Sequence, residues 1–215
     1  MTKSNDKEVV KKSKGMNLPN KITCVRLVIS AVVLIILATP WNYFGFDFPT
    51  YSVFGVENVN LKYIICGILF MIGSITDFLD GYIARKYNLV TDFGKVMDAI
   101  ADKVLVNGVL IILAYDKFIP LIVPVIIITR DIVVDSIKMA SGSKGKVVAA
   151  SWPGKIKTIC MMVGVTLVFF YNIPFAFIGN GIRIDYLFVY VATIMSVVSA
   201  CQYYLANKDF IFSEM

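Results

Sequence analysis

Four aspartates recur at helical spacing in a stretch of the chain that is otherwise apolar. Asp77 and Asp80 are three residues apart, and Asp98 and Asp102 are four residues apart, so each pair lies on one face of an α-helix. Carboxylates within apolar helices are costly and usually functional. Their oxygens suit Mg²⁺ or Mn²⁺, and two such cations would balance the four negative charges. Because paired metals suit phosphoryl chemistry, the spacing predicts a two-metal site that acts on a phosphorylated substrate.

The elements that must position these aspartates are membrane helices. Of the 215 residues, 58% are hydrophobic and 17% are charged, which is the composition of an integral membrane protein. The apolar runs lack the alternation of a transmembrane barrel. Windows of about the length that spans a bilayer as a helix occur at residues 22–41, 62–83, 96–115, 118–140, 156–178 and 184–206. We therefore expect an all-α membrane protein with six transmembrane helices in a domain of residues 16–207, between cytosolic tails at residues 1–15 and 208–215.

The distribution of Lys and Arg predicts the orientation. With a cytosolic N-terminus, the predicted outer segments hold only Lys62, Lys117 and Arg183, as the positive-inside rule requires. Both termini would then be cytosolic. Asp77 and Asp102 would each lie about nine residues inside the inner ends of their helices, or roughly 13 Å deep. This predicts a polar, metal-containing cavity open to the cytosol, and the net charge of +6 needs no nucleic acid to explain it.

Small and basic residues flank the aspartates. Gly81, Ala84 and Gly94 would leave room for a bulky ligand, and Arg85 is placed to meet its phosphates. The structural alternative is that the aspartates form ion pairs with basic residues of the spans and that the small residues allow close helix packing. The chain contains no histidine, which excludes imidazole acid-base chemistry.

A second set of basic residues indicates an anionic ligand. Arg26, Arg130, Lys155 and Lys157 fall at or within the predicted inner ends of spans, where a cation is costly unless an anion compensates it. We interpret them as the binding site for the phosphate of an acceptor substrate. The alternative is that they contact lipid headgroups at the ends of their helices.

The stretch "DFLDGYIARKYNLVTDFGKVMDAIAD", residues 77–102, resembles the signature of the CDP-alcohol phosphatidyltransferase family. All eight fixed positions of D-x2-D-G-x2-A-R-x8-G-x3-D-x3-D are filled. The resemblance implies a six-helix membrane enzyme, usually a homodimer, in which a hydroxyl group displaces CMP from a CDP-linked lipid. It implies that the two metals are bound by Asp77, Asp80, Asp98 and Asp102, with Asp102 also acting as the base. It further implies a CDP pocket formed by Asp77, Gly81, Ala84, Arg85 and Gly94.

Two further stretches indicate the acceptor. "MNLPNKITCVRL" at residues 16–27 and "PGKIKT" at residues 153–158 resemble the bacterial branch of the family that makes phosphatidylglycerol phosphate. This implies CDP-diacylglycerol and glycerol 3-phosphate as substrates and the plasma membrane of a bacterium as the location. Asn20, Thr23 and Lys138 are further possible site residues.

One segment departs from that branch and leaves alternatives open. Where such members read R-E-x4-G-L-R, this chain reads "RDIVVDSIK", with Asp135 near the position of the usual small pair. Another acceptor within the same family is therefore the nearest alternative, either phosphatidylglycerol to form cardiolipin, inositol phosphate, or serine. A non-enzymatic cation transporter is the alternative from another class, but the paired repeats or broken helices typical of transporters are not visible.

Overall fold

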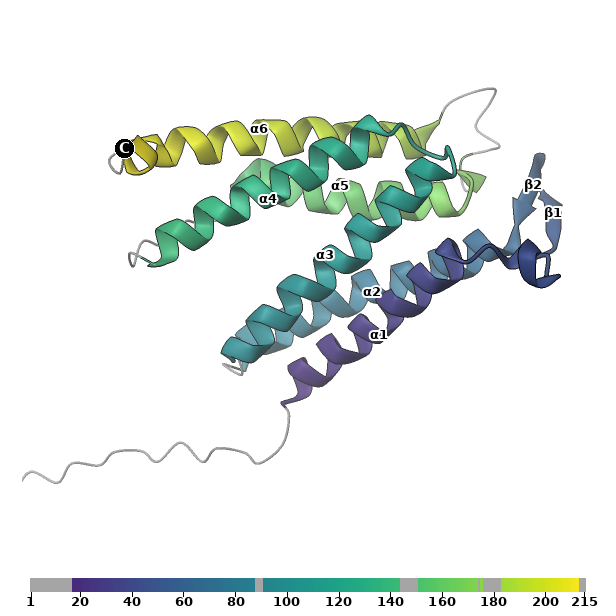
Figure 1. Ribbon diagram of the computed structural model, residues 1–215, viewed down its shortest axis with the longest axis horizontal. Helices are drawn as coiled ribbons and strands as arrows, with labels where there is room; N and C mark the ends of the chain where they lie inside the picture. The colour runs from purple at the N-terminus through teal and green to yellow at the C-terminus, as the bar shows by residue number, and fades with distance from the viewer. Residues whose placement is uncertain (1–16, 88–90, 144–150, 174, 176–182, 213–215) are drawn as a thin grey trace, which may run out of the picture.

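The computed structural model describes residues 17–87, 91–143, 151–173, 175 and 183–212. Within this part of the chain, each predicted apolar window overlaps one long helix (Figure 1), although the window 156–178 extends past the end of its helix: α1 (Leu18–Ala38), α2 (Leu61–Lys86), α3 (Asp92–Tyr115), α4 (Ile122–Ser143), α5 (Trp152–Phe169) and α6 (Ile184–Phe212). The predicted N-terminal tail, the lysines between α4 and α5, and the last residues of the predicted C-terminal tail lie outside the described residues. The helical membrane-protein class predicted from the sequence is confirmed.

Side-chain caps determine where two of the site helices begin. The hydroxyl of Thr91 accepts a hydrogen bond from the Gly94 amide at 3.0 Å at the start of α3. The hydroxyl of Ser151 accepts one from the Gly154 amide at 3.4 Å at the start of α5. Such caps satisfy amides that have no partner within the helix. Both capping residues also contact the candidate site.

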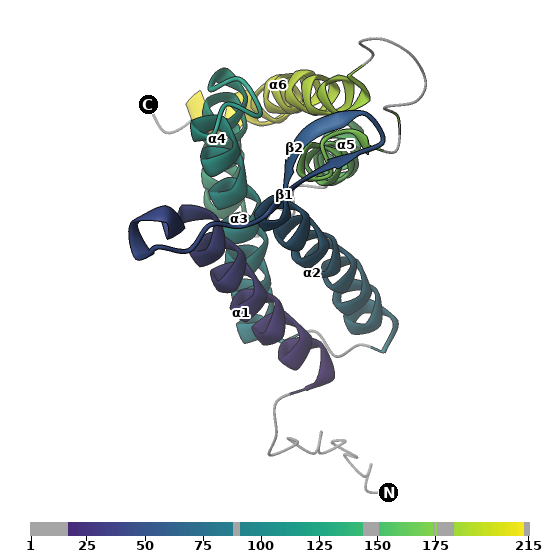
Figure 2. The ribbon, with the colours of Figure 1, turned by 90° about the vertical axis from the view of Figure 1, so that its right-hand side faces the viewer.

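The six helices pack as two groups of three. In the first group α1 lies against both α2 and α3, and in the second α6 lies against both α4 and α5 (Figure 2). α2 joins the groups by packing on α5, where a Cβ added to Gly67 would lie 2.7 Å from the Cβ of Phe169. α2 and α3 contact each other less than each contacts α1. The aspartate-bearing helices are therefore held in place largely by α1.

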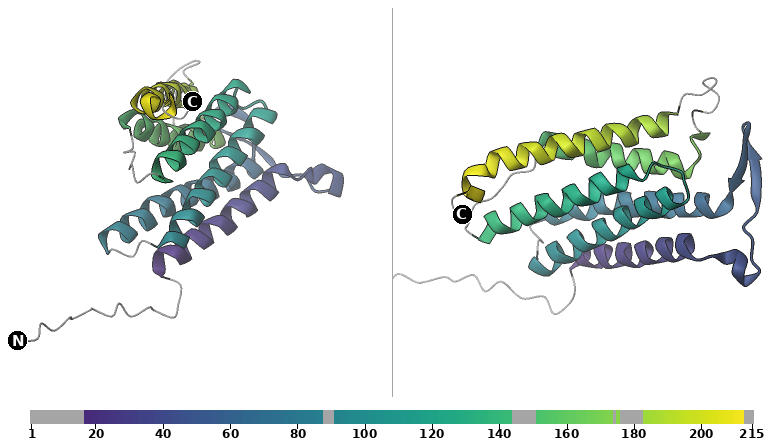
Figure 3. Two further views of the ribbon diagram at one scale, coloured as in Figure 1. Left: turned by 60° about the vertical axis from the view of Figure 1, so that its left-hand side comes forward. Right: turned by 45° about the horizontal axis from the view of Figure 1, so that its top comes forward.

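The polypeptide between α1 and α2 forms a small hairpin where the sequence indicated only an aromatic loop. A 3₁₀ turn (Trp41–Phe44) leads into the antiparallel strands β1 (Thr50–Val53) and β2 (Val56–Asn60). Phe54 and Gly55, between the strands, both have positive φ, at 49° and 81°, as a tight hairpin turn requires. This hairpin projects from the opposite end of the bundle to that at which α1 begins and α6 ends (Figure 3). The all-α expectation therefore holds for the bundle but not for this connection.

Four of the helices are long and apolar enough to cross a membrane: α1, residues 61–84 of α2, α5, and residues 184–207 of α6. The other two are interrupted by charged residues. α3 carries Asp98, Asp102 and Lys103 in its last 18 residues, and α4 carries Arg130 and Asp131 near its middle. α3 and α4 are therefore less apolar than the other helices, and both carry predicted site residues.

Candidate active site

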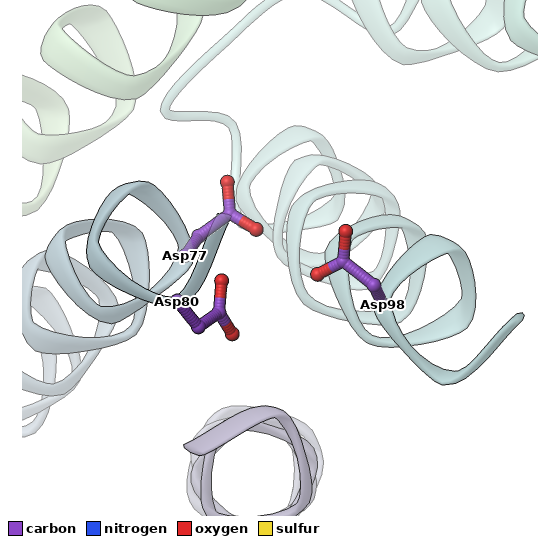
Figure 4. A group of neighbouring side chains, drawn as sticks. All are labelled: Asp77, Asp80 and Asp98. Carbon is purple, nitrogen blue, oxygen red and sulfur yellow. The ribbon is translucent and has the colours of Figure 1, made fainter. Parts of the chain in front are cut away.

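Three of the four predicted metal-binding aspartates lie together. Asp77 and Asp80 on α2 face Asp98 on α3 (Figure 4), and each offers a carboxylate oxygen within 4.8 Å of the others. Asp80 is buried, and Asp77 and Asp98 are partly buried. This set of oxygen donors fits a hard divalent cation. Asp102 does not belong to the group.

Arg26 of α1 reaches into these carboxylates. Its Nη1 atom contacts Asp77, and its Nη2 atom contacts Asp98 and lies 3.8 Å from Asp80 Oδ2. The Arg26 side chain is only 1% exposed. A cation that has lost its hydration in this way requires anions beside it. The predicted acceptor residue Arg26 therefore lies with the carboxylates of α2 and α3, a position that its place in the sequence did not reveal.

Two further polar residues of α1 lie on the same face as Arg26, at intervals of three residues. The Thr23 hydroxyl donates to Asp80 Oδ2 at 3.1 Å. The Asn20 amide donates to the hydroxyl of Thr91 at 3.0 Å, which in turn caps α3. Residues 20–26 of α1 therefore contact both aspartate-bearing helices, because Thr23 binds the Asp80 carboxylate and Asn20 binds the residue that caps α3.

Gly94 has a steric role that the sequence did not indicate. A Cβ added at this position would lie 2.5 Å from Asn20 Oδ1, so the absence of a side chain allows α1 and α3 to approach. Of the other predicted CDP-pocket residues, Gly81 and Ala84 are partly buried on α2. The side chain of Arg85 lies outside the described part of the structure.

Two of the predicted acceptor-binding cations meet at a carboxylate that was not predicted. Lys157 on α5 donates to both oxygens of Asp131 on α4, each at 2.9 Å. Arg130 donates from Nη1 to Asp131 Oδ1, also at 2.9 Å. The side chains of all three are at most 16% exposed. The signal for Asp131 was present in the sequence, because it follows Arg130 directly within an apolar segment.

Residues of α6 orient Arg130. Its Nη2 atom donates to the hydroxyl of Ser199, which lies 2.9 Å from the hydroxyl of Ser151. The Tyr203 hydroxyl accepts from the Ser151 amide at 3.1 Å, and the Tyr203 ring centre is 5.8 Å from the Arg130 guanidinium carbon. Ser199 and Tyr203 are about 70 residues from Arg130 in the sequence, and no local pattern marks them.

Asp102 lies between the carboxylate group and the cationic group. It follows Asp98 by one helical turn on α3 and lines a pocket of about 30 Å³ together with Lys157, Asp131 and Asn107. A pocket of this size holds little more than a water molecule. The candidate base is therefore close to both groups.

The predicted acceptor residue Lys155 and the further possible site residue Lys138 lie apart from the Asp131 carboxylate. Lys155 is exposed, with its Nζ atom 5.6 Å from the centre of the Trp152 ring. Lys138 is also exposed, with its Nζ atom 5.3 Å from the centre of the Tyr203 ring. Asp135 belongs to the segment in which this chain differs from the related family members. It forms an ion pair with Lys103, and this ion pair connects α4 to α3 next to Asp102.

Comparison with known proteins identifies the family. The sequence profile of the CDP-alcohol phosphatidyltransferases matches residues 16–200. The chain is 38% identical to a Bacillus subtilis protein over 193 residues, covering 90% of this chain and 96% of that protein. It is 32% identical to a Rickettsia bellii protein over 200 residues, covering 90% and 97% of the two chains. A Mycoplasma genitalium protein is 39% identical over 149 residues, covering 69% and 62%.

All three relatives are named CDP-diacylglycerol–glycerol-3-phosphate 3-phosphatidyltransferase. The resemblance inferred from residues 77–102 is confirmed by matches that extend over most of the chain. The chain belongs to the CDP-alcohol phosphatidyltransferase family and is a phosphatidyltransferase.

Proposed function

We propose that this chain transfers the phosphatidyl group of CDP-diacylglycerol to glycerol 3-phosphate, forming phosphatidylglycerol phosphate and CMP. The names of its bacterial relatives support these substrates. The observation that carries the proposal is the arrangement on α3. Asp98 belongs to the carboxylate group, and Asp102, one turn away, lines a pocket with Lys157. A site for a diphosphate and a site for an acceptor phosphate would thus adjoin.

In this proposal the basic residues bind the acceptor. Arg130 and Lys157, held by Asp131, would bind the phosphate of glycerol 3-phosphate through charge-assisted hydrogen bonds. Lys155 and Lys138, which are exposed, would contribute at the entrance to the site. Arg26 contacts the carboxylates, so we assign it to the side of the site that binds the diphosphate.

Asp102 would act as the base. Its carboxylate would take the proton from the primary hydroxyl of glycerol 3-phosphate. The hydroxyl oxygen would form a bond to the phosphorus that carries diacylglycerol, the bond from that phosphorus to the bridging oxygen of the diphosphate would break, and CMP would leave with the electron pair. Asp77, Gly81, Ala84, Arg85 and Gly94 would surround the CDP moiety.

The carboxylate group would hold divalent cations. Asp77, Asp80 and Asp98 provide oxygen donors within reach of one ion, and Asp102 would complete the set for two ions of Mg²⁺ or Mn²⁺. When bound, such ions neutralise the charge that develops on the diphosphate. Because the donors are all carboxylates and the group lies at the meeting point of α2 and α3, the residues fit these ions.

We further propose that all six helices cross a bacterial plasma membrane, as a domain of residues 16–207. α3 and α4 would cross with their charged residues facing the interior of the bundle. α1 begins and α6 ends at the same end of the bundle, which supports placing both termini on one side of the membrane, and the distribution of Lys and Arg favours the cytosolic side for them and for the site. Association into homodimers is part of the proposal and rests on the family resemblance alone.

The experiment that tests this function is CMP release from CDP-diacylglycerol vesicles that contain the purified protein. The acceptor is varied among glycerol 3-phosphate, phosphatidylglycerol, inositol phosphate and serine. We expect release with glycerol 3-phosphate, accompanied by formation of phosphatidylglycerol phosphate. Faster CMP release with another acceptor would show that glycerol 3-phosphate is not the preferred acceptor, although the chain would still be a phosphatidyltransferase. Undiminished release after chelation of divalent cations would contradict the proposed metal site.

A further inference from the structure

Arg26 is bound to the same carboxylates that form the candidate metal site. Its guanidinium contacts Asp77 and Asp98 and lies 3.8 Å from Asp80 Oδ2. Each of these three carboxylates has an oxygen atom within 4.8 Å of the others. Arg26 is part of α1, and its side chain contacts carboxylates on both α2 and α3.

A divalent cation and Arg26 would use the same carboxylates. Asp77 Oδ1 and Asp98 Oδ1 contact the guanidinium, whereas Mg²⁺ requires carboxylate oxygens at about 2.1 Å. Two cations placed this close would repel each other strongly in the protein interior. Full occupancy of the carboxylates by a metal ion therefore requires Arg26 to leave them.

Before a metal ion binds, Arg26 compensates the repulsion between the carboxylates. The Arg26 side chain is 1% exposed, whereas those of Asp77 and Asp98 are 28% and 49% exposed, so water screens the interaction only from the carboxylate side. Without this positive charge, repulsion between the carboxylates would destabilise the packing of α2 against α3 unless a proton neutralised one of them. The Arg26 Nε atom is buried and has no hydrogen-bond partner among the described residues, so the guanidinium has a donor left unused in this position.

We propose that Arg26 is an internal counter-cation, which holds the carboxylates together before metal binding and is displaced from them by the metal. The inference rests on the proposed metal site and adds a role for α1. Arg26 stabilises the metal-free fold and lowers the affinity of the site for metal. A free aspartate cluster of the same geometry would bind divalent cations more tightly.

The experiment measures Mn²⁺ binding by electron paramagnetic resonance in the purified full-length protein. Wild type is compared with Arg26→Gln, Arg26→Lys and Lys21→Gln. Lys21 is exposed on the same helix, so Lys21→Gln removes an equal charge away from the carboxylates. We expect Arg26→Gln to lower the Kd for Mn²⁺ about tenfold or more, and the other two variants to stay within about threefold of wild type.

Thermal unfolding provides the second measurement. Metal-free Arg26→Gln should unfold at a lower temperature than wild type, and saturating Mn²⁺ should remove most of the difference. Unchanged or weaker Mn²⁺ binding by Arg26→Gln, or instability that Mn²⁺ does not correct, would overturn the proposed role of Arg26. Asp98→Asn tests the metal site itself and should weaken Mn²⁺ binding. If wild type binds no Mn²⁺, the metal site is wrong and the inference fails with it.

Discussion

Lys157 on α5 donates hydrogen bonds to both carboxylate oxygens of Asp131 on α4, each at 2.9 Å. Arg130 shares one of these oxygens. One carboxylate therefore fixes the positions of two cations that we propose bind the acceptor phosphate. Such an arrangement preorganises the cations, and an entering phosphate would then share them with Asp131.

Removal of the Asp131 charge should lower the unfolding temperature of the protein, and binding of glycerol 3-phosphate should partly restore it. Asp131→Asn leaves two largely buried cations without their counter-charge, at a cost of about 2 kcal/mol. We expect a lower unfolding temperature in detergent solution and partial recovery when glycerol 3-phosphate is added. Asp116→Asn is the matched control, because Asp116 accepts a hydrogen bond from Tyr63 at 2.7 Å in a different part of the bundle. Recovery of both variants by glycerol 3-phosphate would show that the effect is not specific to the acceptor site.

The two lysines of the "GKIKT" segment should differ in function. Lys157 is buried against Asp131, whereas Lys155 is exposed near Trp152. Lys157→Gln should raise the KM for glycerol 3-phosphate by about tenfold or more, because a hydrogen bond to a charged group is lost. Lys155→Gln should change the KM by less than about threefold. Steady-state kinetics of CMP release measure both, and equal effects would contradict the assignment of Lys157.

Gly94 should be required for the approach of α1 to α3. A methyl group at this position meets Asn20 Oδ1 at 2.5 Å, and we expect Gly94→Ala to lower the free energy of unfolding by about 1–2 kcal/mol. The double variant Gly94→Ala with Asn20→Ala should regain part of this loss, because the obstructing side chain is then removed. Thermal unfolding of the single and double variants measures the effect. If the double variant shows the sum of two independent losses, the proposed clash is wrong.

Asp102 and Asp98 should separate proton transfer from metal binding. Asp102 lies outside the group of three carboxylates, so Asp102→Asn should reduce kcat by about 100-fold or more while the ion held by Asp77, Asp80 and Asp98 still binds. Asp98→Asn should weaken Mn²⁺ binding as well as turnover. Near-normal CMP release by Asp102→Asn would show that another group accepts the proton.

The spacing of the aspartates predicted the part of the site that lies on α2 and α3. A helical period of 3.6 residues fixes which side chains share a face, and the short connection between α2 and α3 makes these helices antiparallel neighbours, so the approach of Asp77 and Asp80 to Asp98 could be inferred from the sequence. The helix windows were predicted because apolar runs of about 20 residues have the length that spans a bilayer as a helix. The β-hairpin was missed because its strands are only four and five residues long, and short strands carry little periodic signal.

The contacts between distant elements could not be predicted. Arg26 lies 51 residues before Asp77 in the sequence, and only the packing of α1 against α2 and α3 brings them together. Ser199 reaches Arg130 across the packing of α6 on α4. Charge alone suggested that both arginines bind an acceptor phosphate. The structure separates them, because Arg26 has carboxylate partners on α2 and α3 and Arg130 has polar partners on α4 and α6.

The most direct test of the proposed function is the dependence of CMP release on glycerol 3-phosphate. Purified protein is placed in vesicles of CDP-diacylglycerol with Mg²⁺, and CMP is measured with and without the acceptor and after chelation. We predict rapid release only when glycerol 3-phosphate and the divalent cation are both present, with one phosphatidylglycerol phosphate formed for each CMP. Absence of release with glycerol 3-phosphate, or release that continues unchanged after chelation, would contradict the proposed reaction.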